Sequence, residues 1–175
     1  MIKLKNIYFI IIFLSLFINP ANANDKVSYI DIDFLLSNTL AGKTLLNTLK
    51  KEEQLKIDKF KSNDQKFKIK EKQILAKKNF ISNEEIKKEI NALQIEFQKY
   101  KKEKTKEIKI LEKKRNENII NFLNLINPII EKYMTDNSIY ILIDKKNVFI
   151  ANKDYDITKK LIELIDNQIK TVAIK

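Results

Sequence analysis

The segment ILAKKNFISNEEIKK, residues 74–88, determines how the chain folds, because it holds the only credible break in a very long helix-forming run. That run extends from Lys43 to Asn127, 85 residues without a glycine or proline. Within the segment Ser82 is followed three residues later by Glu85, the spacing of a capping box, in which each side chain bonds the backbone N–H of the other. We therefore predict two long helices, the second starting just after Ser82, with the tip of the turn near residues 79–83.

The length of these helices predicts an extended shape. At about 1.5 Å per residue each would reach roughly 50 to 65 Å, more than a small globular core can cover. We expect residues 43–118 to form an antiparallel helical hairpin whose two arms project into solvent. The apolar stripes that would join the arms are thin, because polar residues interrupt them. The first stripe and its interruptions are Leu46, Glu53, Phe60, Phe67, Ile74 and Ile81, with polar Lys56, Asn63, Lys70 and Lys77 at the partner positions. The second is Ile86, Ile90, Leu93, Phe97, Tyr100 and Leu111, interrupted by Lys104 and Glu107.

Six arm residues are candidate contacts for a bound ligand: Phe60, Phe67, Phe97, Tyr100, Lys77 and Lys78. Aromatic residues at helical spacing more often form a core between helices, and that interpretation stays open here. The alternative is that thin stripes leave the aromatic rings accessible on flexible arms.

The N-terminus has the pattern of a secretory signal. Lys3 and Lys5 precede an apolar run over residues 7–18, and the small-residue sequence Ala-Asn-Ala follows at residues 21–23. This pattern predicts that residues 1–23 are a signal peptide and that the mature protein works outside the cytoplasm. An uncleaved membrane anchor is the alternative, although the apolar run is short for a bilayer span.

The excess positive charge lies on the predicted arms. The chain has 34 Lys and Arg against 23 Asp and Glu, and residues 43–118 alone carry 23 basic and 13 acidic residues. Such a surface can attract nucleic acid, anionic lipid or acidic protein, or it can simply keep the arms solvated. Export removes chromosomal DNA as a routine partner, which leaves anionic envelope lipid and other proteins.

Composition argues against catalysis. The sequence contains no Cys, His or Trp, so it lacks disulfides, the commonest general base and the usual zinc ligands. We expect no cofactor, no metal and no enzymatic activity. The carboxylates available in the body are Asp31, Asp144 and Asp156, and strand-end or capping roles explain them more simply.

The two ends of the chain, residues 24–42 and 119–175, are expected to form one discontinuous body. Its first part contains a strand near Val27–Ile32, a helical turn and then Gly42, the only glycine, which either serves as a hinge or allows a close packing contact. The second arm enters the body with a wide apolar face between Ile119 and Tyr133. Pro128 lies inside that face and predicts a kink, a second hinge, where arm becomes body.

The remaining sequence predicts a hairpin and a closing helix. Residues 138–143 and 148–151 are expected to be two strands joined by a turn, in which Asn147 takes the left-handed conformation. A helix should begin at residues 156–158, with a buried face formed by Leu161, Leu164, Ile165 and Val172. Because so few residues cannot form a secure core alone, we expect several copies to assemble through the body.

Both ends resemble the Skp (OmpH) family of periplasmic chaperones. The resemblance lies in Lys26–Asp31 with Ala41-Gly42-Lys43, in Ile139–Ala151, in Asp156-Ile157-Thr158 with Leu161, and in the placement of Pro128. It implies an α+β fold in which a helical hairpin, or tentacle, projects from a small β-strand body that assembles into a trimeric barrel. It also implies an ATP-independent holdase that keeps unfolded outer-membrane proteins in a basic cavity, with anionic envelope lipid as a further partner.

Two function classes follow from these observations. The first is the periplasmic holdase, for which the absence of a P-loop glycine pattern means that release cannot depend on nucleotide. The second is a structural coiled-coil spacer or tether of the cell envelope. A holdase should carry a mixture of unfolded outer-membrane proteins, whereas a spacer should bind one fixed partner.

Overall fold

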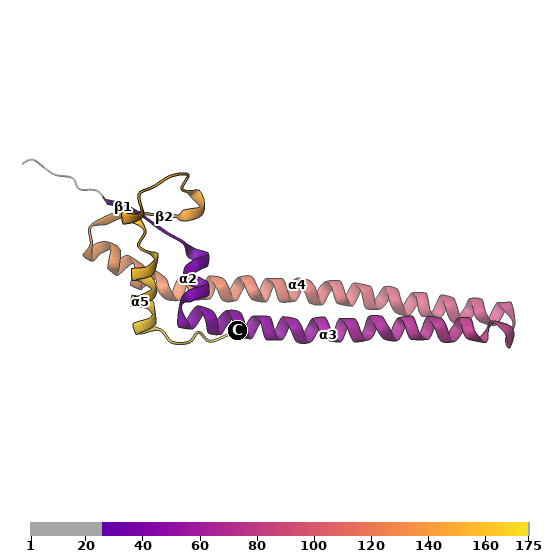
Figure 1. The fold of residues 1–175 in the computed structure, drawn as a ribbon. Helices are drawn as coiled ribbons and strands as arrows, with labels where there is room; N and C mark the ends of the chain where they lie inside the picture. The colour runs from indigo at the N-terminus through magenta and orange to yellow at the C-terminus, as the bar shows by residue number, and fades with distance from the viewer. Residues whose placement is uncertain (1–25, 175) are drawn as a thin grey trace, which may run out of the picture.

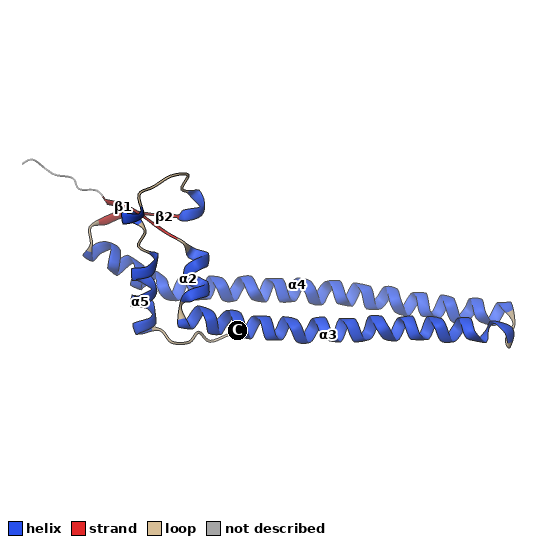
Figure 2. Ribbon diagram, viewed as in Figure 1, coloured by secondary structure: helices blue, strands red, loops and turns tan. Residues whose placement is uncertain are grey.

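A computed structural model describes residues 26–174 of the chain; the predicted signal peptide lies outside the described residues. The elements in order are β1 (Lys26–Ile30), α2 (Ile32–Asn38), α3 (Leu40–Ala76), η1 (Lys77–Asn79), α4 (Asn83–Asp136), β2 (Ile139–Asp144), η2 (Lys145–Asn147), η3 (Lys153–Tyr155) and α5 (Thr158–Gln168). Helices α3 and α4 form a long hairpin that extends from a small body made of the two chain ends (Figure 1). Nearly all of the remaining regular structure is helical, with two short strands in the body (Figure 2).

The hairpin is antiparallel, and ion pairs between the two arms fix its register. Five of them cross from α3 to α4, and a sixth joins η1 to α4: Lys56–Glu107, Lys70–Glu96, Asp64–Lys104, Glu52–Lys114, Glu53–Arg115 and, from η1, Lys77–Glu89. These side chains are roughly one-third to one-half exposed, so each pair contributes only about 0.2–1 kcal/mol. Together they fix the alignment of the two arms, because each pair forms only when the two helices have one particular offset along their axes.

The thin apolar seam is confirmed. Between Leu49 and Ile74 no α3 side chain is buried. The polar residues that interrupt the stripes occupy places in the seam instead of apolar partners: Lys104 bonds Asp64 at 2.8 Å, and Glu107 pairs with Lys56. The arms are therefore joined by alternating apolar and ionic layers.

The core lies where the arms enter the body. Side chains from α2, the root of α3, the last part of α4 and α5 meet there, and those with no exposed surface include Leu35, Leu45, Phe122, Leu161 and Ile165. The chain remains helical through Pro128 to Asp136. The body thus has a helical core with the strands at its margin.

The predicted hairpin after α4 is wrong. β2 pairs with β1 in parallel, Val27 facing Ile141 and Ile30 facing Asp144. Residues 148–151 form no strand, and the side chains of Phe149 and Ile150 are exposed. The segment has strand-forming residues, but within residues 26–174 no ladder is available to satisfy its backbone groups, and a strand needs such a partner.

The backbone turn also differs from the prediction. Among the described residues other than glycine, Ser138 alone has a positive φ, 54°, so Asn147 is not left-handed. Ser138 directly precedes β2, where the chain reverses after α4, and that reversal takes the place of the predicted turn.

The closing helix is confirmed with two adjustments. Leu161 and Ile165 are fully buried and Leu164 is partly buried. Helix α5 ends at Gln168, so Val172 lies beyond it, although it still packs against the core together with Ile174. Figure 1 shows this C-terminal segment running back to the root of the arms.

Candidate functional site

The tip of the hairpin is built by the predicted capping box. The Ser82 hydroxyl accepts a bond from the Glu85 N–H at 3.2 Å, and the Glu85 carboxylate accepts one from the Ser82 N–H at 3.0 Å. The bonds that the Glu85 carboxylate accepts from the Ser82 N–H and from the Ser82 hydroxyl hold the pKa of Glu85 below its usual value. The box satisfies donors at the start of α4 and so fixes where the chain turns.

The tip also presents an exposed apolar side chain close to two lysines. Phe80 is 86% exposed and directly follows η1, which contains Lys77 and Lys78. Lys77 pairs with Glu89 at 2.9 Å. Of the two lysines predicted as ligand contacts, Lys78 is therefore the one that remains available.

The predicted aromatic contacts meet halfway along the arms. The Phe67 ring lies 5.2 Å from that of Phe97, edge on, and 5.1 Å from that of Tyr100. The Tyr100 hydroxyl donates to the Phe60 carbonyl oxygen at 3.1 Å. The four residues thus form one cluster across the arms, in which Tyr100 is buried and Phe97 remains 36% exposed.

An ion pair borders this cluster. The Lys104 ammonium lies 2.8 Å from the Asp64 carboxylate and 5.4 Å from the centroid of the Phe60 ring. The hydrogen bond from Lys104 lowers the pKa of Asp64, and the same bond raises the pKa of Lys104. Burial raises the pKa of Tyr100, with a further contribution from Asp64. Asp64 and Lys104 therefore stay charged, and Tyr100 stays neutral, near pH 7.

A groove of about 720 Å³ opens beside the cluster, here called the aromatic groove. Its apolar lining is Phe67, Leu93, Phe97, Tyr100 and Ile108. Its charged lining is Lys68, Lys101, Lys104, Asp64 and Glu71. The sequence analysis identified three of the rings but missed the groove, because its residues come from both arms and meet only in the register of the two helices.

The root of α3 is tightly packed. Gly42 lies in the first turn of the helix and is buried, and a Cβ atom there would come 1.9 Å from the Leu36 carbonyl oxygen. The Thr39 hydroxyl accepts from the Gly42 N–H at 3.2 Å, and the Asp166 carboxylate accepts from the Leu40 N–H at 2.7 Å. Of the two roles predicted for Gly42, these contacts support the close approach.

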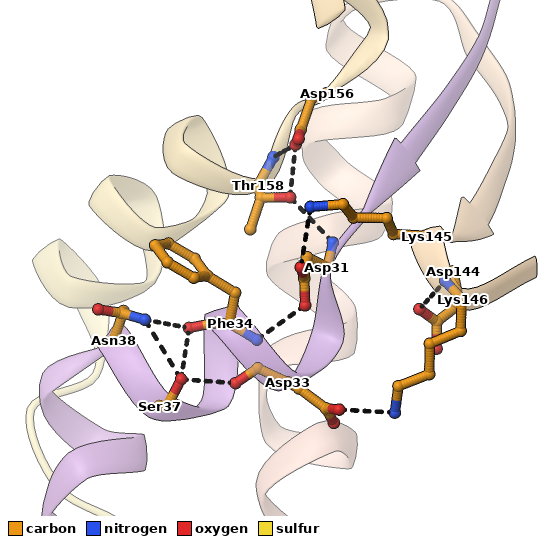
Figure 3. A network of polar contacts seen from close by, with 10 residues as sticks. All are labelled: Asp31, Asp33, Phe34, Ser37, Asn38, Asp144, Lys145, Lys146, Asp156 and Thr158. Atoms are coloured by element: carbon orange, nitrogen blue, oxygen red, sulfur yellow. Dashed lines mark hydrogen bonds and ion pairs between the residues drawn. The ribbon is translucent and has the colours of Figure 1, made fainter. Parts of the chain in front are cut away.

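Next to this root, a polar network joins the start of α2, the turn after β2 and the start of α5 (Figure 3). Lys145 lies 3.1 Å from Asp31, and Lys146 lies 2.8 Å from Asp33. The hydrogen bond from the Phe34 N–H, followed by that from Lys145, lowers the pKa of Asp31. The ion pairs tie the turn after β2 to the start of α2.

Local hydrogen bonds from backbone N–H groups account for the three body carboxylates. Asp31 caps α2 and accepts from Phe34 at 2.9 Å, and Asp144 accepts from the Lys146 N–H at 3.1 Å. Asp156 accepts from the Thr158 N–H at 3.0 Å, at the start of α5. This is the simpler interpretation that the sequence favoured over a catalytic one.

The body exposes apolar surface next to its small sheet. Phe149 is fully exposed and Ile150 nearly so, and on β2 Tyr140 is 66% and Ile141 54% exposed. The sheet that the structure describes has two strands, with a single further bridge from Tyr29 to Asp156 beyond β1. The outer edge of β2 is therefore open in the single chain. Within residues 26–174, every helix is too short or too polar to span a bilayer.

The protein is thus a long helical hairpin on a small body with an open strand edge. The model of the outer membrane protein (OmpH-like) family matches residues 26–165, and the chain belongs to this family. A crystal structure of a proposed outer membrane chaperone (OmpH-like) from Caulobacter crescentus has the same fold, with a TM-score of 0.72 and 20% identity, covering 84% of this chain and 87% of that one. No functionally curated protein matches the sequence.

Proposed function

We propose that the protein is an ATP-independent holdase chaperone of the periplasm, which binds unfolded outer-membrane β-barrel proteins, prevents their aggregation and delivers them for assembly. Membership of the OmpH-like family and the signal-like N-terminus support this role. The observation that carries it is the arm: α3 buries no side chain between Leu49 and Ile74. Most of the chain's positive charge and many apolar side chains therefore remain available to another molecule.

Clients would be held by many weak contacts. The net positive charge of residues 43–118 attracts acidic segments over a distance that salt shortens. Exposed apolar side chains then add contacts that do not demand one sequence; Leu55, Phe80 and Ile95 are each more than 70% exposed. No single contact is strong, so a client can leave as it folds, without nucleotide.

We further propose that the working form is a homotrimer. The open edge of β2 and the exposed segment with Phe149 and Ile150 support assembly through the body, because unpaired strand edges and exposed apolar residues favour pairing with another chain. The choice of three subunits rests on the resemblance to the Skp (OmpH) family. Three arms hanging from one assembled body would surround a basic cavity, and bending of α4 near Pro128 would let its size vary.

An aggregation assay tests the holdase. A urea-denatured outer-membrane β-barrel protein is diluted into buffer with and without a severalfold excess of the trimer, and light scattering is followed. We expect scattering to be suppressed at low salt and less so at 0.5 M NaCl, because screening shortens the reach of the arm lysines. Unchanged scattering at this excess would overturn the proposal.

A further inference from the structure

The two sides of the arm hairpin differ in chemistry. The aromatic groove has five apolar lining residues and a volume of about 720 Å³. A second groove, of about 300 Å³, reaches Phe67 and Tyr100 from residues that are otherwise charged or amide-bearing, such as Lys66, Lys99 and Glu103. On α4, positions 99 and 101 are separated by about 200° around the axis, so these two grooves lie on different sides. The first joins five apolar residues to lysines, whereas the second reaches only two aromatic rings.

Exposed apolar side chains of α4 line the aromatic groove. Phe97 is 36% and Ile108 39% exposed, although both are large apolar residues beside other apolar groups. They are separated by about 16 Å along the helix. Each could bury more surface against a bound apolar side chain, a gain of about 25 cal/mol for each Å² removed from water.

Two lysines lie between these apolar positions. The register of the arms, in which Asp64 faces Lys104 and Lys70 faces Glu96, brings Lys68 and Lys101 to nearly the same level on opposite helices. Within residues 26–174 neither makes an ion pair, although Lys101 lies 5.7 Å from the centroid of the Phe97 ring. Two carboxylates, Asp64 and Glu71, line the groove beside the three lysines Lys68, Lys101 and Lys104, and Asp64 is already bonded to Lys104. The middle of the groove therefore has charge that complements an acidic group.

We propose that the aromatic groove binds extended segments of unfolded polypeptide in which an acidic side chain lies between two apolar ones. Side chains on one face of an extended chain recur every ~6.6 Å, close to the roughly 6 Å between Phe97 and Lys101 along α4. The second apolar residue would follow two to four positions later and reach Ile108, about 10 Å further on. The inference rests on the proposed holdase function and assigns part of it to one site.

Four variants of the full mature protein test the groove. Lys101→Glu and Ile108→Ser change it, while Lys102→Glu and Ile110→Ser make the same changes at exposed positions of α4 outside it. The probe is a fluorescently labelled outer-membrane β-barrel protein, unfolded in urea and diluted, with binding followed by anisotropy. We expect the two groove variants to weaken binding about three- to tenfold, as central interface residues do, and the two controls to stay within about twofold.

Cross-linking tests the class of segment. A photoreactive benzoylphenylalanine placed at Thr105, in the aromatic groove, is compared with one at Lys99, in the second groove. Mass spectrometry of the cross-linked client should show, for position 105 only, segments with an acidic residue between apolar ones. The same segments from both positions, or no such pattern at 105, would overturn the inference.

The outcomes separate this inference from the function on which it rests. If the wild-type protein does not bind the unfolded client, both fail. If it binds and all four variants bind equally, only the groove assignment fails. Helicity by circular dichroism checks the fold of each variant, and Lys101→Glu decides the matter if Ile108→Ser disturbs the arm, because Lys101 is a surface residue.

Discussion

Replacing Gly42 with alanine should destabilise the protein, although alanine is the better helix former. In an open helix the change would stabilise by about 1 kcal/mol. Here the new Cβ would lie 1.9 Å from the Leu36 carbonyl oxygen and 2.7 Å from the Thr39 hydroxyl oxygen. The first neighbour is backbone and cannot rotate away, so α2 and the root of α3 would have to separate. Overpacking of this kind costs about 3 kcal/mol at the upper end of its usual range, which leaves a net loss of about 2 kcal/mol.

Urea unfolding followed by circular dichroism measures this loss. Variants are compared at one protein concentration, because assembly would make the midpoint depend on concentration. Ser62→Ala, at an exposed position of α3, is the control and should stabilise by a few tenths of a kcal/mol. A Gly42→Ala protein as stable as the wild type, or more so, would refute the close-packing explanation and return Gly42 to the role of a flexible hinge.

Three further predictions concern the tip, the body and its network. Ser82→Ala should cost about 1 kcal/mol of local stability, seen as faster amide exchange in the first turn of α4 but not at the arm root; equal exchange would contradict the capping role. Phe149→Ser combined with Ile150→Ser should lower the assembled mass in light scattering without loss of helicity, and an unchanged mass would exclude these residues from the subunit contact. Asp31→Asn should make stability less dependent on pH: the lowered pKa of Asp31 stabilises the fold above the ordinary carboxyl value of 3.8, and that stabilisation disappears as pH falls through the folded pKa. Denaturation midpoints between pH 6 and pH 3 that fall equally in both proteins would contradict this role.

The arms could be predicted from the sequence because their signals are local. A capping box within a run free of glycine and proline fixes where one helix starts, and Ser82 and Glu85 make the expected bonds. The partners of Lys104 and Glu107 could not be found by examining each helix alone. They depend on the register between the arms. That register can be found from the position of the turn, by aligning the charges of α3 with those of α4 read in the opposite direction.

The body was less predictable because its contacts are distant in sequence. Residues 148–151 have the composition of a strand, but composition does not say which chain would supply the neighbouring ladder. β2 instead pairs with β1, more than one hundred residues away, and the arms lie between them in the sequence. The aromatic groove was missed for the same reason: Lys68 and Lys101 face each other only when α3 and α4 are aligned.

Size-exclusion chromatography coupled to light scattering tests the central claim most directly. The mature protein is run alone and after mixing with a urea-unfolded outer-membrane β-barrel protein. The proposed holdase predicts a mass of three chains for the protein alone, and a stable complex of three chains with one client after mixing. A single-chain mass, or a client that aggregates and elutes apart from the protein, would contradict it.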